Sequence, residues 1–193
     1  GQSAERVLGG EVPHRDFDEP YTGLLSYVHA AAFAVGGVRL PVLRIVLFIA
    51  TLCWLAAVYR IALPSTGPPG AALVTLVALA WSVPNYPGSM PSWYNLFCAT
   101  FGVAALLRWD ASGRTRWLVL AGLAGGISFL VKLSGLFYVA GAGLFLLYAT
   151  RARPEGGERP DRAARAFAVV ATVALLCLVI VTWRSLAAFR TLR

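Results

Sequence analysis

The sequence predicts an all-α protein, a polytopic bundle of transmembrane helices with interfacial helices in its first extracytoplasmic loop. Long uncharged runs cover residues 45–59, 61–107, 117–131 and 166–183. The chain is 58% hydrophobic and 13% charged, whereas soluble domains are about 45–50% apolar and about 25% charged. Only helices and closed barrels satisfy every backbone group in lipid. The runs lack the alternation of barrel strands, which leaves helices.

Residues 1–40 are predicted to form the extracytoplasmic and interfacial region. Apolar residues recur at helical spacing within 2–9, which favours a short interfacial helix. Residues 10–21 contain Pro13 and Pro20 and are therefore expected to form a loop. Residues 23–36 are apolar but shorter than the roughly 20 residues that a crossing needs. We expect a half-helix there, ended by the glycine pair that follows it.

The whole chain, residues 1–193, is predicted to be one membrane domain. Proline- and glycine-rich stretches at 64–70 and 84–91 indicate turns. Arg60, the Arg108-Trp109-Asp110 stretch and the Lys132–Gly135 interruption also separate apolar segments. The expected spans are approximately 41–60, 71–84, 92–107, 117–131, 136–149 and 166–183.

The distribution of arginine predicts the topology. Arginines cluster in the 108–116 and 151–165 loops, which the positive-inside rule assigns to the cytoplasm. The loop at 10–21, the loop at 84–91 and Lys132 then share the extracytoplasmic face. The basic tail at 184–193 would lie on the extracytoplasmic face too, against the positive-inside rule. We explain this exception by a tail that lies on the membrane surface or binds an anionic lipid. This distribution accounts for the net charge of +8 without a nucleic-acid partner.

The sequence indicates no metal site and no cofactor. Its three cysteines, Cys53, Cys98 and Cys177, lie inside apolar runs without metal-ligand spacing. They are expected to be free, membrane-buried thiols. We find no glycine-rich phosphate loop and no nucleophile elbow in the sequence.

The loop at 10–21 holds the candidate catalytic residues. Five of the nine acidic residues precede residue 20, and the next one is Asp110. Asp16, Asp18 and Glu19 could supply a carboxylate that deprotonates an acceptor hydroxyl. In an extended segment, the first two side chains would point the same way. The alternative interpretation is a solvated charged loop.

Five further residues are candidates for substrate binding. Lys132 is the only lysine and interrupts an apolar stretch, so it could contact a phosphate or simply snorkel to the interface. Arg15 could pair with the neighbouring acids, and His14 could titrate near neutrality, although a plain loop residue is the interpretation favoured for His14. Trp93 and Tyr94 could stack on a sugar, although an aromatic belt is the interpretation we favour.

Three stretches of the chain resemble bacterial polytopic glycosyltransferases of the GT-C fold. They are the loop segment at 4–21 with its Val-Pro-His-Arg-Asp-Phe run, the Pro-Ser-Trp-Tyr-Asn-Leu-Phe segment at 91–97, and the glycine-rich segment at 117–136 that contains Phe-Leu-Val-Lys. Members of this group include protein mannosyltransferases of family 39 and lipid A aminoarabinose transferases. The resemblance covers roughly residues 4–150.

The resemblance implies inverting transfer of a sugar from a polyprenyl-phosphate carrier to a glycan, lipid or protein acceptor. It also implies a multi-pass protein of the bacterial inner membrane, with the lipid bilayer as a partner. Family members usually place a catalytic aspartate just before the first loop, so we expect this chain to be a fragment that lacks that span. Ser92 and Asn95 stand where many members carry an acid, which puts that second acidic role in doubt.

Two other classes of function are open. A transporter or lipid-handling protein would usually carry ionisable residues at the membrane midplane, and the predicted spans hold no charge at their centres. A non-catalytic membrane module descended from the enzyme is the other alternative. The sequence does not indicate the sugar, the acceptor or the oligomeric state.

Overall fold

A computed structural model describes residues 1–151, and every regular element in that part of the chain is helical. The elements are α1 Gln2–Leu8, α2 Leu24–Gly36, α3 Leu40–Ala80, the short 3₁₀ helix η1 Val83–Asn85, α4 Pro91–Ser112, α5 Thr115–Val131 and α6 Gly135–Arg151. The all-α prediction is confirmed for these residues. The expected span at 166–183 and the basic tail lie outside them.

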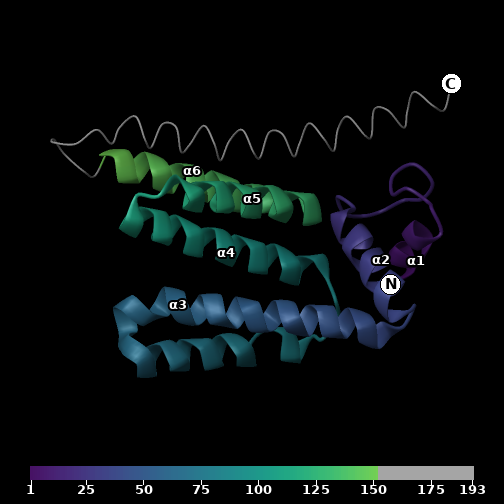
Figure 1. Cartoon of the computed structure of the whole chain (residues 1–193), viewed down its shortest axis with the longest axis horizontal. Coiled ribbons are helices and arrows are strands. Elements are labelled where there is room, and N and C mark those ends of the chain that lie inside the picture. Colours follow the sequence, from purple (N-terminus) through teal and green to yellow (C-terminus); the bar gives the residue numbers. More distant parts are fainter. Residues whose placement is uncertain (152–193) are drawn as a thin grey trace.

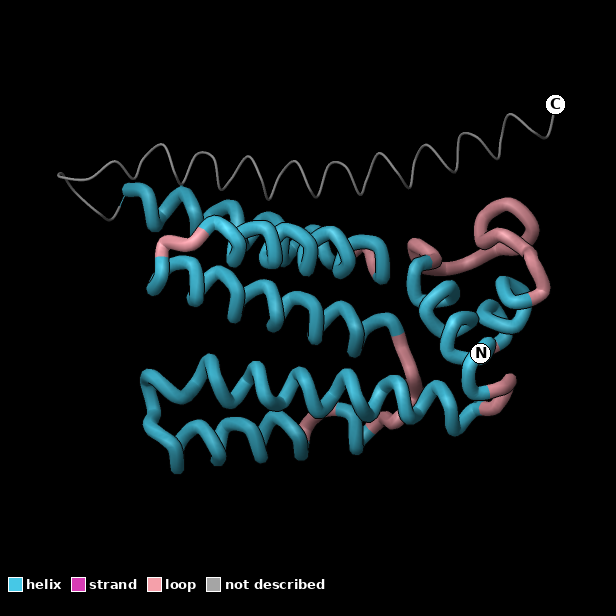
Figure 2. The backbone as a smooth tube through the Cα atoms, viewed as in Figure 1, coloured by secondary structure: helices cyan, strands magenta, loops and turns pink. Residues whose placement is uncertain are grey.

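Helix α3 bends back on itself at the predicted turn. Gly67 adopts the non-helical angles φ 67° and ψ 176°, and Pro64, Pro68 and Pro69 surround it. Each proline removes a backbone donor, and glycine tolerates a positive φ. The two arms, 40–66 and 68–80, therefore run antiparallel, as Figures 1 and 2 show. The first arm continues past Arg60, where the sequence predicted its end, because the break comes only at Gly67.

Helix α4 also runs past its predicted end. The Arg108-Trp109-Asp110 stretch was expected to stop the helix, but α4 continues to Ser112 and ends at Gly113 with φ 65°. Trp109 is buried and belongs to the apolar cluster that joins α4 to α5 and α6. Packing of this side chain therefore outweighs the local polarity, and a left-handed glycine provides the stop.

Helices α4, α5 and α6 pack closely because of small residues. Gly122, Gly125 and Gly126 of α5 are buried, and small residues of this kind let helices approach closely. Tyr138 of α6 enters between α4 and α5 and donates to the Ala121 carbonyl at 3.1 Å. A Cβ atom at Gly125 would lie 3.0 Å from the Tyr138 ring, so glycine makes room for it.

One helix among the described residues is long and apolar enough to cross a membrane. It covers Leu40–Asn85, and its most apolar window has a mean hydropathy of 2.2. The segments Leu24–Gly36, Thr115–Val131 and Gly135–Ala149 are shorter apolar helices. Large apolar side chains are also exposed on the outer faces of the bundle, for example Leu73, Phe137 and Leu144. Apolar surface on this scale indicates a lipid or protein neighbour.

The connections gather at the two ends of the bundle (Figure 1). The bend of α3 and the connection between α4 and α5 lie at one end. The 10–21 loop, the start of α3, the segment after α3 and the connection between α5 and α6 lie at the other. The sequence predicted this grouping from charge and parity. α1 and α2 cover this second end, where Ala4, Ala30, Phe33 and Leu43 form a small core.

Candidate functional site

The candidate site begins where α5 stops. Lys132 has the extended angles φ −157° and ψ 138° and follows the last helical residue, Val131. The chain then turns so sharply that the Gly135 amide donates to the Lys132 carbonyl at 2.8 Å. A Cβ atom at Gly135 would lie 2.4 Å from the Phe129 backbone nitrogen. Only glycine therefore lets α6 start this close to α5.

The Lys132 ammonium reaches across to α4. Its Nζ donates to Ser92 Oγ at 2.9 Å and lies 5.9 Å from the centre of the Tyr21 ring. The two ion pairs found among residues 1–151 are Arg6–Glu11 and Arg15–Asp16. Lys132 takes part in neither, so its charge is available to an anion.

Asn95 fixes the distance between α4 and the end of α5. Its Nδ2 donates to the carbonyls of Ser128 at 3.2 Å and Lys132 at 3.4 Å. Ser128 Oγ, which is fully buried, donates back to the Asn95 carbonyl at 3.4 Å. Ser92 and Asn95 therefore both contact Lys132 directly.

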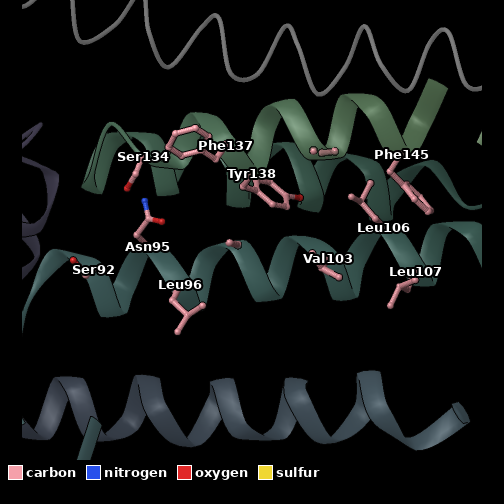
Figure 3. Close-up of a pocket in the computed structure, with 13 residues that line it drawn as sticks. Ser92, Asn95, Leu96, Val103, Leu106, Leu107, Ser134, Phe137, Tyr138 and Phe145 are labelled. Carbon is pink, nitrogen blue, oxygen red and sulfur yellow. The ribbon is translucent and has the colours of Figure 1, made fainter. Parts of the chain in front are cut away.

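A groove of about 600 Å³ opens beside this cluster, between α4 and α6. Ser92, Asn95 and Ser134 lie at one end, as Figure 3 shows, and apolar side chains line the remainder. The apolar lining includes Leu96, Val103, Leu107, Phe137 and Phe145. The groove is thus polar at the mouth, beside Lys132, and apolar along its length. This is the pattern that suits an amphiphile with an anionic head.

The acidic loop is folded into a tight turn rather than extended. The His14 amide donates to the Phe17 carbonyl at 2.9 Å, and His14 has a φ of 65°. Phe17 is buried under the Arg6 guanidinium, whose Cζ lies 4.4 Å from the ring centre. The predicted loop is confirmed. It is closed onto α1 by burial of Phe17, so the extended segment in which Asp16 and Asp18 would point the same way does not form.

Asp16 is held on both sides within this turn. Arg15 donates to both of its carboxylate oxygens, at 2.9 Å and 2.7 Å, and the Val12 amide donates to Oδ2 at 2.7 Å. The hydrogen bonds from Arg15 and then from Val12 lower the pKa of Asp16 to about 2. A carboxylate this acidic is a weak base, so its geometry suits a structural role.

The two other predicted acids differ in their contacts. Glu19 Oε2 accepts a hydrogen bond from Ser26 Oγ at 2.9 Å, which ties the loop to the first turn of α2. Asp18 is exposed, and within residues 1–151 neither an ion pair nor a hydrogen bond to its carboxylate is found. Asp18 is consequently the member of the cluster whose carboxylate is free to accept a proton. His14 is exposed at the same turn.

A threonine that the sequence did not single out connects the loop to the last turn of α5. Thr22 Oγ1 donates to the carbonyl of Leu130 and lies 3.2 Å from that of Phe129. Both carbonyls belong to the last turn of α5, where no intrahelical donor remains for them. The only signal in the sequence was the position of Thr22 between the loop and α2.

The two aromatic candidates are engaged within the fold. Trp93 Nε1 donates to the Tyr86 carbonyl at 3.1 Å, and its ring packs against the cluster around Phe97. The Tyr94 hydroxyl lies 2.8 Å from Ser89 Oγ, which lies 3.0 Å from Nε2 of His29. These contacts favour packing within the fold over sugar stacking. The aromatic belt favoured from the sequence stays a prediction.

The part of the chain that the structure describes holds no group of three His, Cys, Asp or Glu side chains that could bind a metal ion. No family model, no curated protein and no solved structure matches this chain. The geometry of the site is therefore the basis for assigning a function.

Proposed function

We propose that the chain belongs to a membrane glycosyltransferase that moves a sugar from a polyprenyl-phosphate carrier to an acceptor hydroxyl on the extracytoplasmic side of the bacterial inner membrane. One observation carries the proposal. The Lys132 ammonium, which forms no ion pair within residues 1–151, donates to Ser92, and Ser92 lies at the polar end of an apolar groove. A phosphate at the mouth would place its prenyl chain along α4 and α6.

We infer that the first arm of α3, the return segment 68–85 and helices α4, α5 and α6 cross the membrane. α4 has 22 residues, about 33 Å at 1.5 Å per residue, against a hydrocarbon core of about 30 Å. α5 and α6 have 17 residues each, about 25 Å, so local thinning of the bilayer would accompany them. The grouping of the acidic loop and Lys132 at one end of the bundle supports a shared membrane face.

The chemistry assigns separate roles to Lys132 and Asp18. The free Asp18 carboxylate takes the proton of the acceptor hydroxyl, whose oxygen forms a bond to the anomeric carbon of the sugar. The bond from that carbon to the phosphate oxygen breaks, and its electron pair leaves with the polyprenyl phosphate. Lys132 offsets the charge that develops on the departing phosphate. Attack opposite the leaving group inverts the anomeric configuration.

Asp16 and Glu19 support the site without reacting in this scheme. Asp16 holds the turn closed through Arg15 and the Val12 amide, and Glu19 anchors the loop on Ser26. This division of roles follows from hydrogen bonding, because a carboxylate already satisfied by donors is a poorer base than a free one.

Membranes containing the full chain, supplied with a polyprenyl-phosphate-linked radiolabelled sugar, test the proposal. Lys132→Met is expected to lower both carrier binding and transfer. Asp18→Asn is expected to lower transfer by roughly 10²–10⁴-fold, the range of general-base catalysis, while binding is kept. Arg114→Gln, an exposed cation between α4 and α5, is the matched control and leaves both unchanged.

The same assay separates the proposal from a lipid-handling function. A chain that binds the carrier through Lys132 but transfers no sugar, with or without the Asp18 carboxylate, would be a lipid-binding module. The groove by itself supports the lipid-handling function, because its apolar lining could hold a lipid chain whether or not a sugar is transferred. Carrier binding that is indifferent to Lys132→Met would exclude both.

A further inference from the structure

A second groove lies between the first arm of α3 on one side and, on the other, the end of its second arm with the segment that follows. It has a volume of about 420 Å³ and shares no lining residue with the groove beside Lys132. Its lining includes Leu47 and Leu52 from one side and Leu79, Val83 and Pro84 from the other. The only lining side chains with polar atoms are Arg44 and Thr51.

Thr51 contributes no polar atom that a ligand could use. Its hydroxyl donates to the Leu47 carbonyl of the same helix at 2.8 Å, so the hydroxyl is satisfied inside α3. Arg44 is thus the only charged residue of the lining, and it lines the apolar groove through the carbon atoms of its side chain. The α3 residues that line it are 44, 47, 48, 51, 52 and 55, one helical face with Arg44 at the end nearest the start of α3.

The Arg44 charge has no partner among the described residues. Arg44 is exposed, and neither ion pair of residues 1–151 includes it. The sequence contains no acidic residue between Glu19 and Asp110. A cation at the end of an apolar groove, with no carboxylate on its own helix, favours a ligand that brings its own negative charge.

We propose that this groove binds an anionic glycerophospholipid of the surrounding membrane, with the phosphate on Arg44 and one acyl chain along α3. The guanidinium can donate two parallel hydrogen bonds to a phosphate. From Arg44 to Leu55 the groove extends about 16 Å at 1.5 Å per residue. Leu52 and Phe48, which line it, are half-exposed at 50% and 61%. A chain laid along them would cover that surface.

This lipid site is independent of sugar transfer, because none of its residues belongs to the candidate active site. Arg44 lies near the start of α3, at the end of the bundle that also holds the acidic loop (Figure 1). With that end outside, the bound lipid comes from the outer leaflet. It would fill the space between the two arms of α3 and hold the hairpin in one conformation.

Native mass spectrometry of the full chain, released from nanodiscs of equal phosphatidylglycerol and phosphatidylcholine, tests the site. The wild-type chain is expected to retain phosphatidylglycerol preferentially. Arg44→Gln should lower that preference about fivefold, the effect of one basic residue on anionic lipid binding, and Arg44→Lys should keep part of it. Arg60→Gln, an exposed cation elsewhere on α3, should leave it unchanged. An unchanged preference in Arg44→Gln, or an equal fall in Arg60→Gln, overturns the proposal.

A second pair of variants tests the groove rather than the charge. Leu52→Trp should fill the groove and lower the amount of retained phosphatidylglycerol. Ile49→Trp, at a neighbouring position that is 56% exposed and outside the lining, should not. Because both replaced side chains are exposed, folding is expected to persist in each variant. Retention that is the same in both variants also overturns the site.

Discussion

The Lys132 Nζ atom lies 2.9 Å from Ser92 Oγ, a contact that joins residues 40 positions apart in the chain. It brings the end of α5 against the start of α4 and places the ammonium beside Ser92, which lines one end of the α4–α6 groove. A hydroxyl can orient an ammonium without neutralising it, whereas a carboxylate would pair with it. The identity of residue 92 therefore determines whether Lys132 is free to bind a phosphate.

Ser92→Asp is expected to weaken binding of polyprenyl phosphate at least tenfold. The new carboxylate would stand within hydrogen-bonding reach of Nζ and compete with the phosphate for the same cation. Competition between a fluorescent polyprenyl phosphate and unlabelled carrier measures the change. Ser92→Asn, which is close in size to aspartate but neutral, is the control and should lose far less. Equal losses in the two variants would show that bulk rather than charge is responsible.

Asp16→Asn is expected to loosen the turn at residues 13–17. Asp16 Oδ2 accepts from the Val12 amide at 2.7 Å, and the neutral amide would lose the ion pair with Arg15. Hydrogen exchange at the Val12 amide should then accelerate, because the loosened turn opens more often and exposes that amide to solvent. Asp18→Asn, at a carboxylate with no contact to the turn, should leave that exchange rate unchanged.

The same turn has a defined dependence on pH. The pKa of Asp16 is lowered from 3.8 to about 2 by its hydrogen bonds, so the turn is stabilised above the unfolded value. That stabilisation declines as pH falls through the window from about 4 to about 2. Val12 exchange in the wild type, corrected for the intrinsic rate, should rise across this window and converge on the Asp16→Asn value. No convergence at the acid end would contradict the assignment.

Much of the helix arrangement could be predicted from the sequence, because charged residues and prolines mark helix breaks and turns locally. The bend at Gly67, the break at Lys132 and the grouping of loops at one end all followed from single residues or from parity. The end of α4 did not, because burial of Trp109 is a tertiary contact that overrides a local polar stretch. The ends of apolar helices depend on side-chain packing and on glycine conformation. Neither can be read from the amino-acid composition.

The sequence predicted the charged residues of the site but not the contacts that position them. Lys132 stood out as the only lysine, but Ser92, its hydrogen-bond partner, was noted only as a departure from a family pattern. The turn around Phe17 was missed because its cause, the Arg6 guanidinium over the ring, joins residues 11 positions apart in the chain. Thr22 gave no signal, since its acceptors are backbone carbonyls of a distant helix.

Gly135→Ala is expected to destabilise the chain by about 1–3 kcal/mol, the usual effect of overpacking. The new Cβ would lie 2.4 Å from the Phe129 nitrogen and 2.5 Å from the Ser128 carbonyl carbon, and backbone atoms cannot move aside as a side-chain end can. Thermal unfolding in detergent measures the loss. Gly141→Ala is the control, since a Cβ there meets nothing within 4 Å. A Gly135→Ala chain as stable as that control would show that the α5–α6 connection is not tightly packed.

His29 gives the contact between α2 and the 84–90 segment a dependence on pH. Its Nε2 lies 3.0 Å from Ser89 Oγ, its ring stands edge-on to Tyr94 at 5.8 Å, and burial lowers its pKa from 6.5 to about 4. Below pH 6.5 the unfolded segment takes up a proton that the folded one does not. The contact therefore loses stability as pH falls from about 6.5 to about 4.

Hydrogen exchange along α2, corrected for the intrinsic rate, should accordingly accelerate on acidification by up to about tenfold per pH unit within that window. His29→Gln removes the titrating group and should flatten the profile, although some protection is lost at every pH because the contact with Ser89 is altered. His14→Gln, at the exposed histidine of the 13–17 turn, is the matched control and should keep the wild-type slope. If His14→Gln flattens the profile and His29→Gln does not, the pH dependence belongs to the loop rather than to the α2 contact.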